Sequence, residues 1–353
     1  MVNIENSAIF TVATKKYLSL AILSLKSVEK FNNLKYKFIF IVDCNEIEIK
    51  EINLSLESQN LNSIKTFCSC DLIGSNKDTF QNSFKYYNNI EVCCLAKYIG
   101  FVHLKTKYST LNFCIFVDSD VFFYGSLTDV MLKFKDYAIY LTPHTIGPIN
   151  DEDEHMYLMH GWVNAGFILI NFRHKHVDEI LSWLVNRISR RGYFAPEYGL
   201  SCDQTWLSLV PMIFPDYTEI SHNDGLNVAY WNLNQRKLRV IDNVFYSNST
   251  QLVFVHFSGY DSKIYPLISK HSNLTIEKDS TLSLLCTIYD KEERVTVNFS
   301  DRNDIVFSTE KLLSRMQIGF NFLGITNKFS TEMPGLFGLF GRKVDSFLKK
   351  IRK

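Results

Sequence analysis

Phe116-Val117-Asp118-Ser119-Asp120-Val121-Phe122-Phe123 says more about the fold class than any other stretch, because it ends a hydrophobic run (113–117) with two carboxylates at positions i and i+2. Alternate side chains of an extended backbone share a face, so Asp118 and Asp120 can point at one ligand. Two hard oxygen ligands beyond the carboxyl end of a buried strand suit Mg²⁺ or Mn²⁺. The Asp-x-Asp pattern is common by itself, and a strand-ending turn with solvated or helix-capping aspartates is the alternative.

The composition is that of a globular protein of enzyme size. The chain has 353 residues, 46% of them hydrophobic, with 38 basic and 37 acidic residues. This charge balance argues against nucleic acid as a partner, and the apolar content is enough for a large core. The simplest division is one main domain over 1–270, an extension over 271–335 and a basic amphipathic tail over 336–353.

Apolar periodicity predicts alternating strands and helices. We expect strands over 9–13, 36–42, 113–117, 167–170 and 252–255, and helices over 15–30, 91–104, 177–188 and 204–210. Such alternation predicts an α/β fold with a mainly parallel central sheet flanked by helices and a ligand at the carboxyl ends of the strands. Beyond about residue 270 the rhythm fades, and a helical C-terminal appendage is expected.

The eight cysteines are scattered and lack paired metal-site spacing, which predicts reduced, mostly buried thiols. The start of the chain lacks the pattern of a signal peptide, and no run approaches eighteen apolar residues. A cytoplasmic location is therefore expected.

Several separated motifs together match one known family. They are Phe10-Thr11-Val12-Ala13-Thr14, Lys97, Phe116-Val117-Asp118-Ser119-Asp120, Val163-Asn164-Ala165-Gly166-Phe167, Asp203-Gln204, Val255-His256-Phe257-Ser258-Gly259 and Lys263. In this order, over roughly residues 7 to 265, the chain resembles the GT-A glycosyltransferases. Within them it looks like the retaining group that includes glycogenin and the bacterial lipooligosaccharide galactosyltransferases.

The resemblance implies a metal-dependent transferase that uses a nucleotide-diphosphate sugar, with UDP as the expected nucleotide. Asp118, Asp120 and His256 would hold Mn²⁺, or Mg²⁺, with Ser119 beside the donor diphosphate. A histidine nitrogen at the end of an apolar strand favours Mn²⁺ somewhat over Mg²⁺. A hydrogen-bonded core histidine is the alternative for His256.

Further positions follow from the same resemblance. Thr11, Ala13 and Tyr17 would cradle uracil and ribose, with simple strand–helix packing as the alternative. Lys97 could reach the sugar or a phosphate, or it could be an ordinary solvated helix lysine. Lys263 offers a point charge for the leaving diphosphate, although its spacing from His256 departs from the family by one residue and Ile264-Tyr265 replaces the usual Pro-Trp.

Asn164, Asp203 and Gln204 match the family positions that flank the donor sugar and form the expected catalytic set. Asp203 would accept hydrogen bonds from sugar hydroxyls, and Gln204 would lie near the anomeric carbon. Helix N-capping is a second role for Asp203. Without a placed carboxylate nucleophile, retention by same-face attack through an oxocarbenium-like state is expected.

Two other segments suggest the acceptor and its location. Residues 222–232 mix amide and aromatic side chains, which suits a carbohydrate acceptor, while the acidic run 151–154 is expected to be a solvated loop near the donor site. In the tail, apolar residues recur at helical spacing beside six basic residues, which is typical of an interfacial helix on anionic lipid. A helix docked on the protein's own core is the alternative. The membrane interpretation fits a lipid-linked glycan acceptor and a peripheral position on the inner face of the membrane.

Two rival functions stay open. A haloacid-dehalogenase-type phosphatase also places Asp-x-Asp after a hydrophobic strand, but that fold needs a later Gly-Asp pair and this sequence contains none. A sugar-nucleotide-binding protein without catalysis is the other. Asp118, Asp120 and His256 argue against it, and turnover would exclude it.

Overall fold

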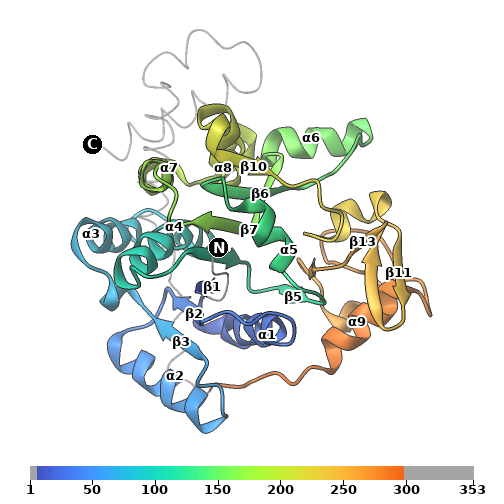
Figure 1. Cartoon of the computed structure of the whole chain (residues 1–353), viewed down its shortest axis with the longest axis horizontal. Coiled ribbons are helices and arrows are strands. Elements are labelled where there is room, and N and C mark those ends of the chain that lie inside the picture. Colours follow the sequence, from blue (N-terminus) through green and yellow to red (C-terminus); the bar gives the residue numbers. More distant parts are fainter. Residues whose placement is uncertain (1–5, 298–353) are drawn as a thin grey trace, which may run out of the picture.

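The computed structural model describes residues 6–297, which form a central seven-stranded sheet between two layers of helices (Figure 1). The strand order is β10-β6-β7-β4-β1-β2-β3. The bounds are β1 Ser7–Ala13, β2 Tyr36–Ile41, β3 Ile64–Phe67, β4 Phe113–Val117, β6 Ile139–Pro143, β7 Val163–Asn171 and β10 Thr218–Ile220. β7 is antiparallel to both neighbours and the other pairs are parallel, so the predicted mainly parallel sheet is confirmed.

The alternation of side chains along the strands explains the two layers. Phe10 and Val12 of β1 face one apolar cluster, and Ile9 and Ala13 face the other. The first cluster is covered by α3 Gly74–Ser83, α4 Asn89–Lys107, α7 Val177–Arg191 and α8 Gln204–Ile213. The second is covered by α1 Leu18–Glu29, α2 Glu46–Ser58 and α5 Thr128–Phe134.

A smaller substructure lies at the carboxyl end of the sheet. β5 Val121–Phe123 pairs antiparallel with β14 Phe254–His256, and this register sets His256 opposite Val121. Phe122, Val255 and Tyr289 share an apolar cluster under this pair. The remaining elements here are β11 Leu238–Ile241, β12 Val244–Ser247, β13 Thr250–Gln251 and α9 Thr281–Lys291.

The prediction of a solvated loop at 151–154 is wrong, because these residues begin a helix. α6 spans Asp151–His160, and the Asn150 side chain caps it by accepting a hydrogen bond from the Asp153 N–H at 2.9 Å. Acidic residues in a first turn are stabilised by the helix dipole. Beyond α7 the chain adds the short pair β8 Phe194–Ala195 and β9 Leu200–Ser201.

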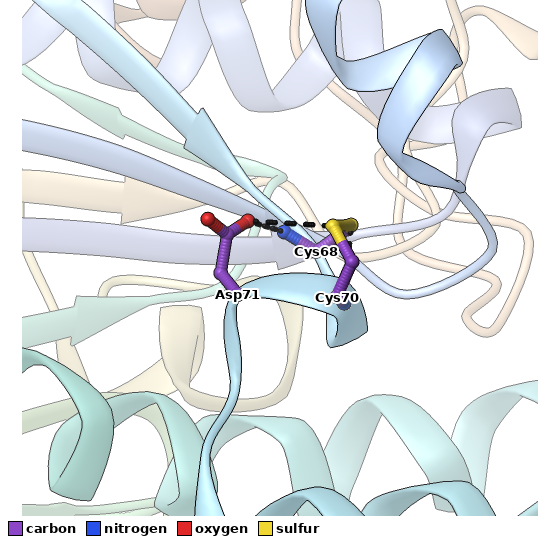
Figure 2. A group of neighbouring side chains, drawn as sticks. All are labelled: Cys68, Cys70 and Asp71. Atoms are coloured by element: carbon purple, nitrogen blue, oxygen red, sulfur yellow. Dashed lines mark hydrogen bonds between the residues drawn. A yellow bond between two sulfur atoms is a disulfide. The ribbon is translucent and has the colours of Figure 1, made fainter.

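Two of the cysteines also differ from expectation. The sulfur atoms of Cys68 and Cys70 are joined in a disulfide beside Asp71 (Figure 2), so the prediction of reduced thiols is wrong for this pair. The other cysteines are free. Cys68, Cys70 and Asp71 lie close enough together to hold a metal, but sulfur atoms in a disulfide are not thiolate ligands.

No helix in the 6–297 part of the chain has both the length and the apolar character needed to cross a bilayer. The amphipathic tail predicted over 336–353, and the extension beyond residue 297, lie outside the described residues.

Candidate functional site

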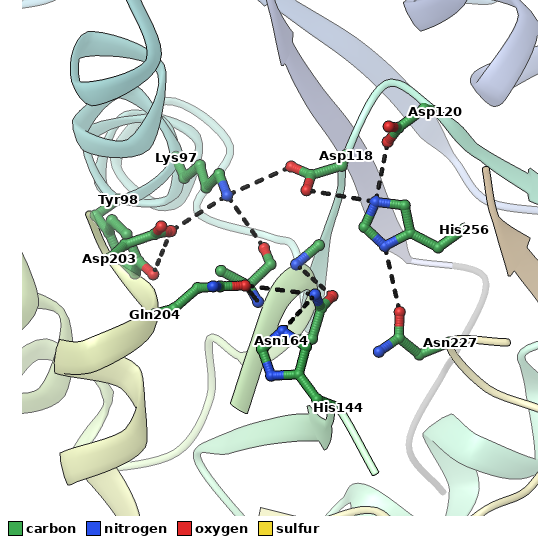
Figure 3. Close-up of polar contacts among 12 residues, drawn as sticks. Lys97, Tyr98, Asp118, Asp120, His144, Asn164, Asp203, Gln204, Asn227 and His256 are labelled. Atoms are coloured by element: carbon green, nitrogen blue, oxygen red, sulfur yellow. Dashed lines mark hydrogen bonds and ion pairs between the residues drawn. The ribbon is translucent and has the colours of Figure 1, made fainter. Parts of the chain in front are cut away.

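Asp118, Asp120 and His256 lie together at the carboxyl end of β4 (Figure 3). The His256 Nε2 atom is 3.1 Å from Asp120 Oδ1 and 3.8 Å from Asp118 Oδ2. One ligand atom from each side chain lies within 4.8 Å of the other two. The aspartate side chains are 34% and 29% exposed while that of His256 is 5% exposed, so the group opens to solvent on its carboxylate side.

Backbone hydrogen bonds hold the two aspartates after the strand ends. The Asp118 N–H donates to Gly166 O at 2.9 Å, and the Val121 N–H donates to Asp118 O at 3.1 Å. This turn feeds the chain into β5, whose pairing with β14 brings His256 to the carboxylates. Gly166 permits this approach, because a Cβ atom there would lie 2.4 Å from His256 Cε1.

The second ring nitrogen of His256 is held by Asn227. His256 Nδ1 lies 3.3 Å from Asn227 Oδ1, so Nδ1 donates and Nε2 faces the carboxylates. Burial opposes the charged imidazole, but Asp120 and Asp118 outweigh it and raise the pKa of His256. Burial likewise opposes ionisation of Asp120, yet His256 holds the pKa of that carboxyl below its usual value.

These donors fit a divalent cation. Two carboxylates and an imidazole combine hard oxygen with one borderline nitrogen, which suits Mn²⁺ and accommodates Mg²⁺. Burial raises the pKa of Asp118 in spite of Lys97 and His256, so a bound cation would stabilise its ionised form.

Lys97 is buried between two carboxylates. Its Nζ atom lies 3.3 Å from Asp118 Oδ1, 3.2 Å from Asp203 Oδ2 and 3.2 Å from Ala165 O. Burial works against its charge, but Asp118 and Asp203 together raise the pKa of Lys97. The interpretation of Lys97 as a solvated helix lysine is therefore wrong, because its side chain is 7% exposed and joins two aspartates.

Asp203 faces the same centre from the start of α8. Its Oδ2 atom accepts hydrogen bonds from Lys97 and from the Tyr98 hydroxyl, the latter at 3.0 Å. The Asp203 side chain makes no capping bond to α8, and the residue has helical φ and ψ, whereas a capping residue is usually extended. The capping role predicted for Asp203 is therefore wrong, because its side chain accepts no hydrogen bond from the α8 backbone.

Asn164 and Gln204 form an adjacent amide pair. Gln204 Oε1 accepts from the Ala165 N–H at 3.3 Å and lies 3.4 Å from Asn164 Nδ2, while Gln204 Nε2 donates to His160 O at 3.3 Å. Asn164 Nδ2 also contacts His144 Nε2 at 3.2 Å. Both amides are thus held in one orientation beside Asp203.

The remaining residues predicted to bind the donor are Thr11, Ala13, Tyr17, Ser119 and Lys263. Thr11 and Ala13 are buried in β1, Tyr17 is 44% exposed after it, and Ser119 lies between the two aspartates. Lys263 is exposed on the short helix η6, Ser262–Ile264, and within residues 6–297 it joins none of the hydrogen bonds or ion pairs of the site.

Within the predicted acceptor segment, two amides are structural. Asn227 and Asn232 are fully buried, and Asn232 Nδ2 donates to His144 O and Asn227 O, each at 2.9 Å. Trp231 packs its ring at 5.2 Å from the His256 ring.

Tyr98, His144 and Asn227 join the site although sequence analysis did not single them out. Tyr98 adjoins Lys97, and Asn227 lies in the segment assigned to the acceptor. His144 directly follows the end of β6, and a polar residue beyond the carboxyl end of a parallel strand is a usable signal.

No family model matches the chain. The uncharacterised protein YfnD of Bacillus subtilis (strain 168) is 24% identical over 211 residues, which cover 59% of this chain and 61% of YfnD, less than two thirds of that relative.

Several solved structures similar to this one are glycosyltransferases. GlyE of Streptococcus pneumoniae TIGR4 is 18% identical with a TM-score of 0.45, covering 81% of this chain and 60% of GlyE. The galactosyltransferase LgtC, solved with donor and acceptor sugar analogues, is 16% identical with a TM-score of 0.40, covering 65% and 77%. Mouse xyloside xylosyltransferase 1 is 13% identical with a TM-score of 0.40, covering 63% and 87%. At such identities and TM-scores, these similarities do not assign a function to this chain.

Proposed function

We propose that this chain is a metal-dependent glycosyltransferase that moves a sugar from a nucleotide diphosphate, expected to be UDP, to a glycan acceptor. One observation carries the proposal. The Asp118–Asp120–His256 group is joined through the buried Lys97 to a second carboxylate, Asp203, and its amide neighbours. A cation site beside a carboxylate and amides that can bind hydroxyl groups suits a substrate that is a diphosphate at one end and a sugar at the other.

Asp118, Asp120 and His256 would hold Mn²⁺ or Mg²⁺, which when bound supplies Lewis-acid stabilisation of the leaving diphosphate. Lys97 lies between Asp118 and Asp203 and forms an ion pair with each carboxylate. Within the described residues, both contacts of the Asp203 carboxylate use Oδ2, which leaves Oδ1 for a sugar hydroxyl.

Gln204 supports a retaining reaction. An amide is a poor nucleophile, and hydrogen bonds at both its oxygen and its nitrogen hold Gln204 in place beside Asp203. Such a group positions the sugar and stabilises a developing positive charge with its carbonyl dipole. The acceptor would then attack on the face that the diphosphate leaves, and the departing phosphate would take the acceptor proton.

The metal ligands are tested by Asp120→Asn, with Asp178→Asn as the matched control because the Asp178 side chain is 74% exposed and pairs with Lys105, which is not one of the site residues. Calorimetry with UDP and Mn²⁺ should show metal-dependent binding for the wild type and the control, and none for Asp120→Asn. If Asp120→Asn binds UDP and Mn²⁺ as the wild type does, the metal site is misassigned.

The sugar-side assignment is tested by Asp203→Asn. Turnover, measured with a panel of nucleotide sugars, should fall far more than UDP affinity, because interactions made in the transition state are lost from the rate. Equal losses in turnover and UDP affinity would instead indicate a structural role for Asp203. Wild-type protein that turns over no nucleotide sugar would refute the proposed activity.

A further inference from the structure

His144 lies at the end of β6, next to Asn164 and between two aromatic rings. The residue is 7% exposed, and its ring centroid lies 5.4 Å from that of Tyr157 and 5.6 Å from that of Trp231. Figure 3 shows the imidazole directly beneath the Asn164 amide. Within residues 6–297, Nε2 contacts Asn164, while the buried Nδ1 has no hydrogen-bond partner of normal geometry.

The hydrogen bonds around Asn164 define the protonation of His144. The Gly166 N–H donates to Asn164 Oδ1 at 3.0 Å, which identifies the amide oxygen and leaves Nδ2 as the donor. Nδ2 lies 3.2 Å from His144 Nε2 and 3.4 Å from Gln204 Oε1, so its two hydrogens have two acceptors. His144 Nε2 must therefore be unprotonated, and the ring proton belongs on Nδ1.

Burial agrees with an uncharged ring. It lowers the pKa of His144 to about 4, against the opposing effect of the Trp162 carbonyl, so the imidazole stays neutral at physiological pH. A protonated ring would turn an N–H toward the Asn164 NH2 group, and two donors would face each other.

The main chain of His144 holds the opposite side of the site. Its carbonyl accepts a hydrogen bond from Asn232 Nδ2 at 2.9 Å, and the same Nδ2 donates to Asn227 O at 2.9 Å. Asn227 in turn bonds His256 Nδ1. His144 thus connects the amides beside Asp203 with the histidine of the metal group.

We propose that His144 is a positioning residue whose neutral imidazole sets the orientation of the Asn164 and Gln204 amides relative to His256. This inference rests on the proposed function. Loss of the acceptor at Nε2 leaves Asn164 Nδ2 with an unsatisfied hydrogen and allows the amide pair to rotate. The donor sugar is then misplaced while the nucleotide site is unchanged.

A pair of substitutions separates this role from simple packing. His144→Gln retains an acceptor near the position of Nε2, whereas His144→Leu fills similar space without one. We expect His144→Leu to lower kcat by about 10- to 100-fold, as small misplacements at reacting centres do, with UDP–Mn²⁺ affinity changed by less than about 2-fold. His144→Gln should recover most of the turnover. Wild-type kcat in His144→Leu, or equal losses in both variants, would overturn the proposal.

A second measurement does not depend on turnover. NMR of isotope-labelled imidazole nitrogens, with the His144 signal assigned by its loss in His144→Gln, should show a neutral ring with its proton on Nδ1 at neutral pH. A proton on Nε2, or a charged ring, would overturn the inference even in an active enzyme. Wild-type protein without turnover would contradict the proposed function, and the NMR result would still test the orientation of His144.

Discussion

Gly166 is a position where one methyl group would disturb both halves of the site. An added Cβ would lie 2.4 Å from His256 Cε1 and 2.9 Å from Asn164 Oδ1. We predict that Gly166→Ala displaces both side chains, weakens Mn²⁺-dependent UDP binding by at least about 10-fold and costs about 1–3 kcal/mol of stability.

Gly147→Ala is the matched control for Gly166→Ala. At Gly147 the nearest atom to an added Cβ is Gln235 Nε2 at 3.9 Å, so there is room for the methyl group. Calorimetric titration of both variants checks the prediction, and equal UDP binding by the two would contradict it.

The charge of Lys97 is needed because Lys97 and its partner Asp203 are both buried. We predict that Lys97→Met lowers the free energy of unfolding by about 3–5 kcal/mol, since it leaves Asp203 facing Asp118 without a cation. Lys50→Met is the control: Lys50 and Glu46 are both 70% exposed, and such pairs contribute under about 1 kcal/mol. Denaturant unfolding measures both, and a similar small loss at each site would argue against a role for buried charge.

Because of His256, we predict that rising pH lowers the stability of the metal-free protein and raises its affinity for Mn²⁺. Its pKa in the metal-free folded protein is raised above 6.5, so its stabilising effect is present below that pH and is lost as pH rises through the folded pKa. Metal binding must displace the proton from Nε2, and Mn²⁺ affinity should therefore increase with pH over the same range.

Melting temperatures measured from about pH 6 to pH 8 test the His256 prediction. The increase in Tm caused by Mn²⁺ should grow with pH, and calorimetry in buffers of different ionisation enthalpy should detect proton release. If the increase in Tm caused by Mn²⁺ does not change with pH, His256 does not bind the metal.

At the scale of elements, α4 delivers Lys97 and Tyr98, and its first turn is held by a capping box. Asn88 Oδ1 accepts from the Glu91 N–H at 3.0 Å, and Glu91 Oε2 accepts from the Asn88 N–H at 2.9 Å. We predict that Asn88→Ala costs about 1 kcal/mol of stability, whereas Asn62→Ala, at an exposed position outside any helix, has little effect. Chemical denaturation compares them, and equal stabilities would show that the cap contributes nothing.

The elements that sequence analysis found are those with long, regular apolar periods. Predicted helices at 91–104 and 177–188 correspond to α4 and α7, and the predicted strand at 113–117 is β4 itself. Sequence analysis missed α2, where Glu46-Ile47-Glu48-Ile49 alternates like a strand. Asn45 caps this helix, and Ile47 is 70% exposed while Ile49 is buried. The short edge strands β3 and β10 were missed because a few residues carry too little pattern.

At the scale of the whole molecule, the basic tail 336–353 remains a proposed membrane contact that is argued from its sequence. We predict that removing residues 334–353 releases the protein from anionic vesicles and spares donor hydrolysis, because every proposed catalytic residue lies upstream. Binding of the full chain should weaken with salt, since surface charges are screened over about 8 Å at physiological ionic strength. Co-sedimentation of the full-length and truncated proteins with anionic vesicles tests this. If both bind equally, or neither binds, the tail is not a membrane contact.

Adjacent residues were enough to predict the fold class and the two aspartates after β4. Burial of a strand, the period of a helix and the i, i+2 spacing of Asp118 and Asp120 are local properties, which a linear pattern records directly. The mainly parallel sheet followed from the alternation of such elements.

The partners of those aspartates depended on the packing of distant segments. The pairing of β5 with β14 brings His256 to Asp120, and the contact of α4 with the start of α8 buries Lys97 against Asp203. The protonation of His144 depends on the amide of Asn164 in a neighbouring strand. A side chain's charge, proton and orientation depend on the groups that surround it in three dimensions, and for these residues those groups come from segments far away in the sequence.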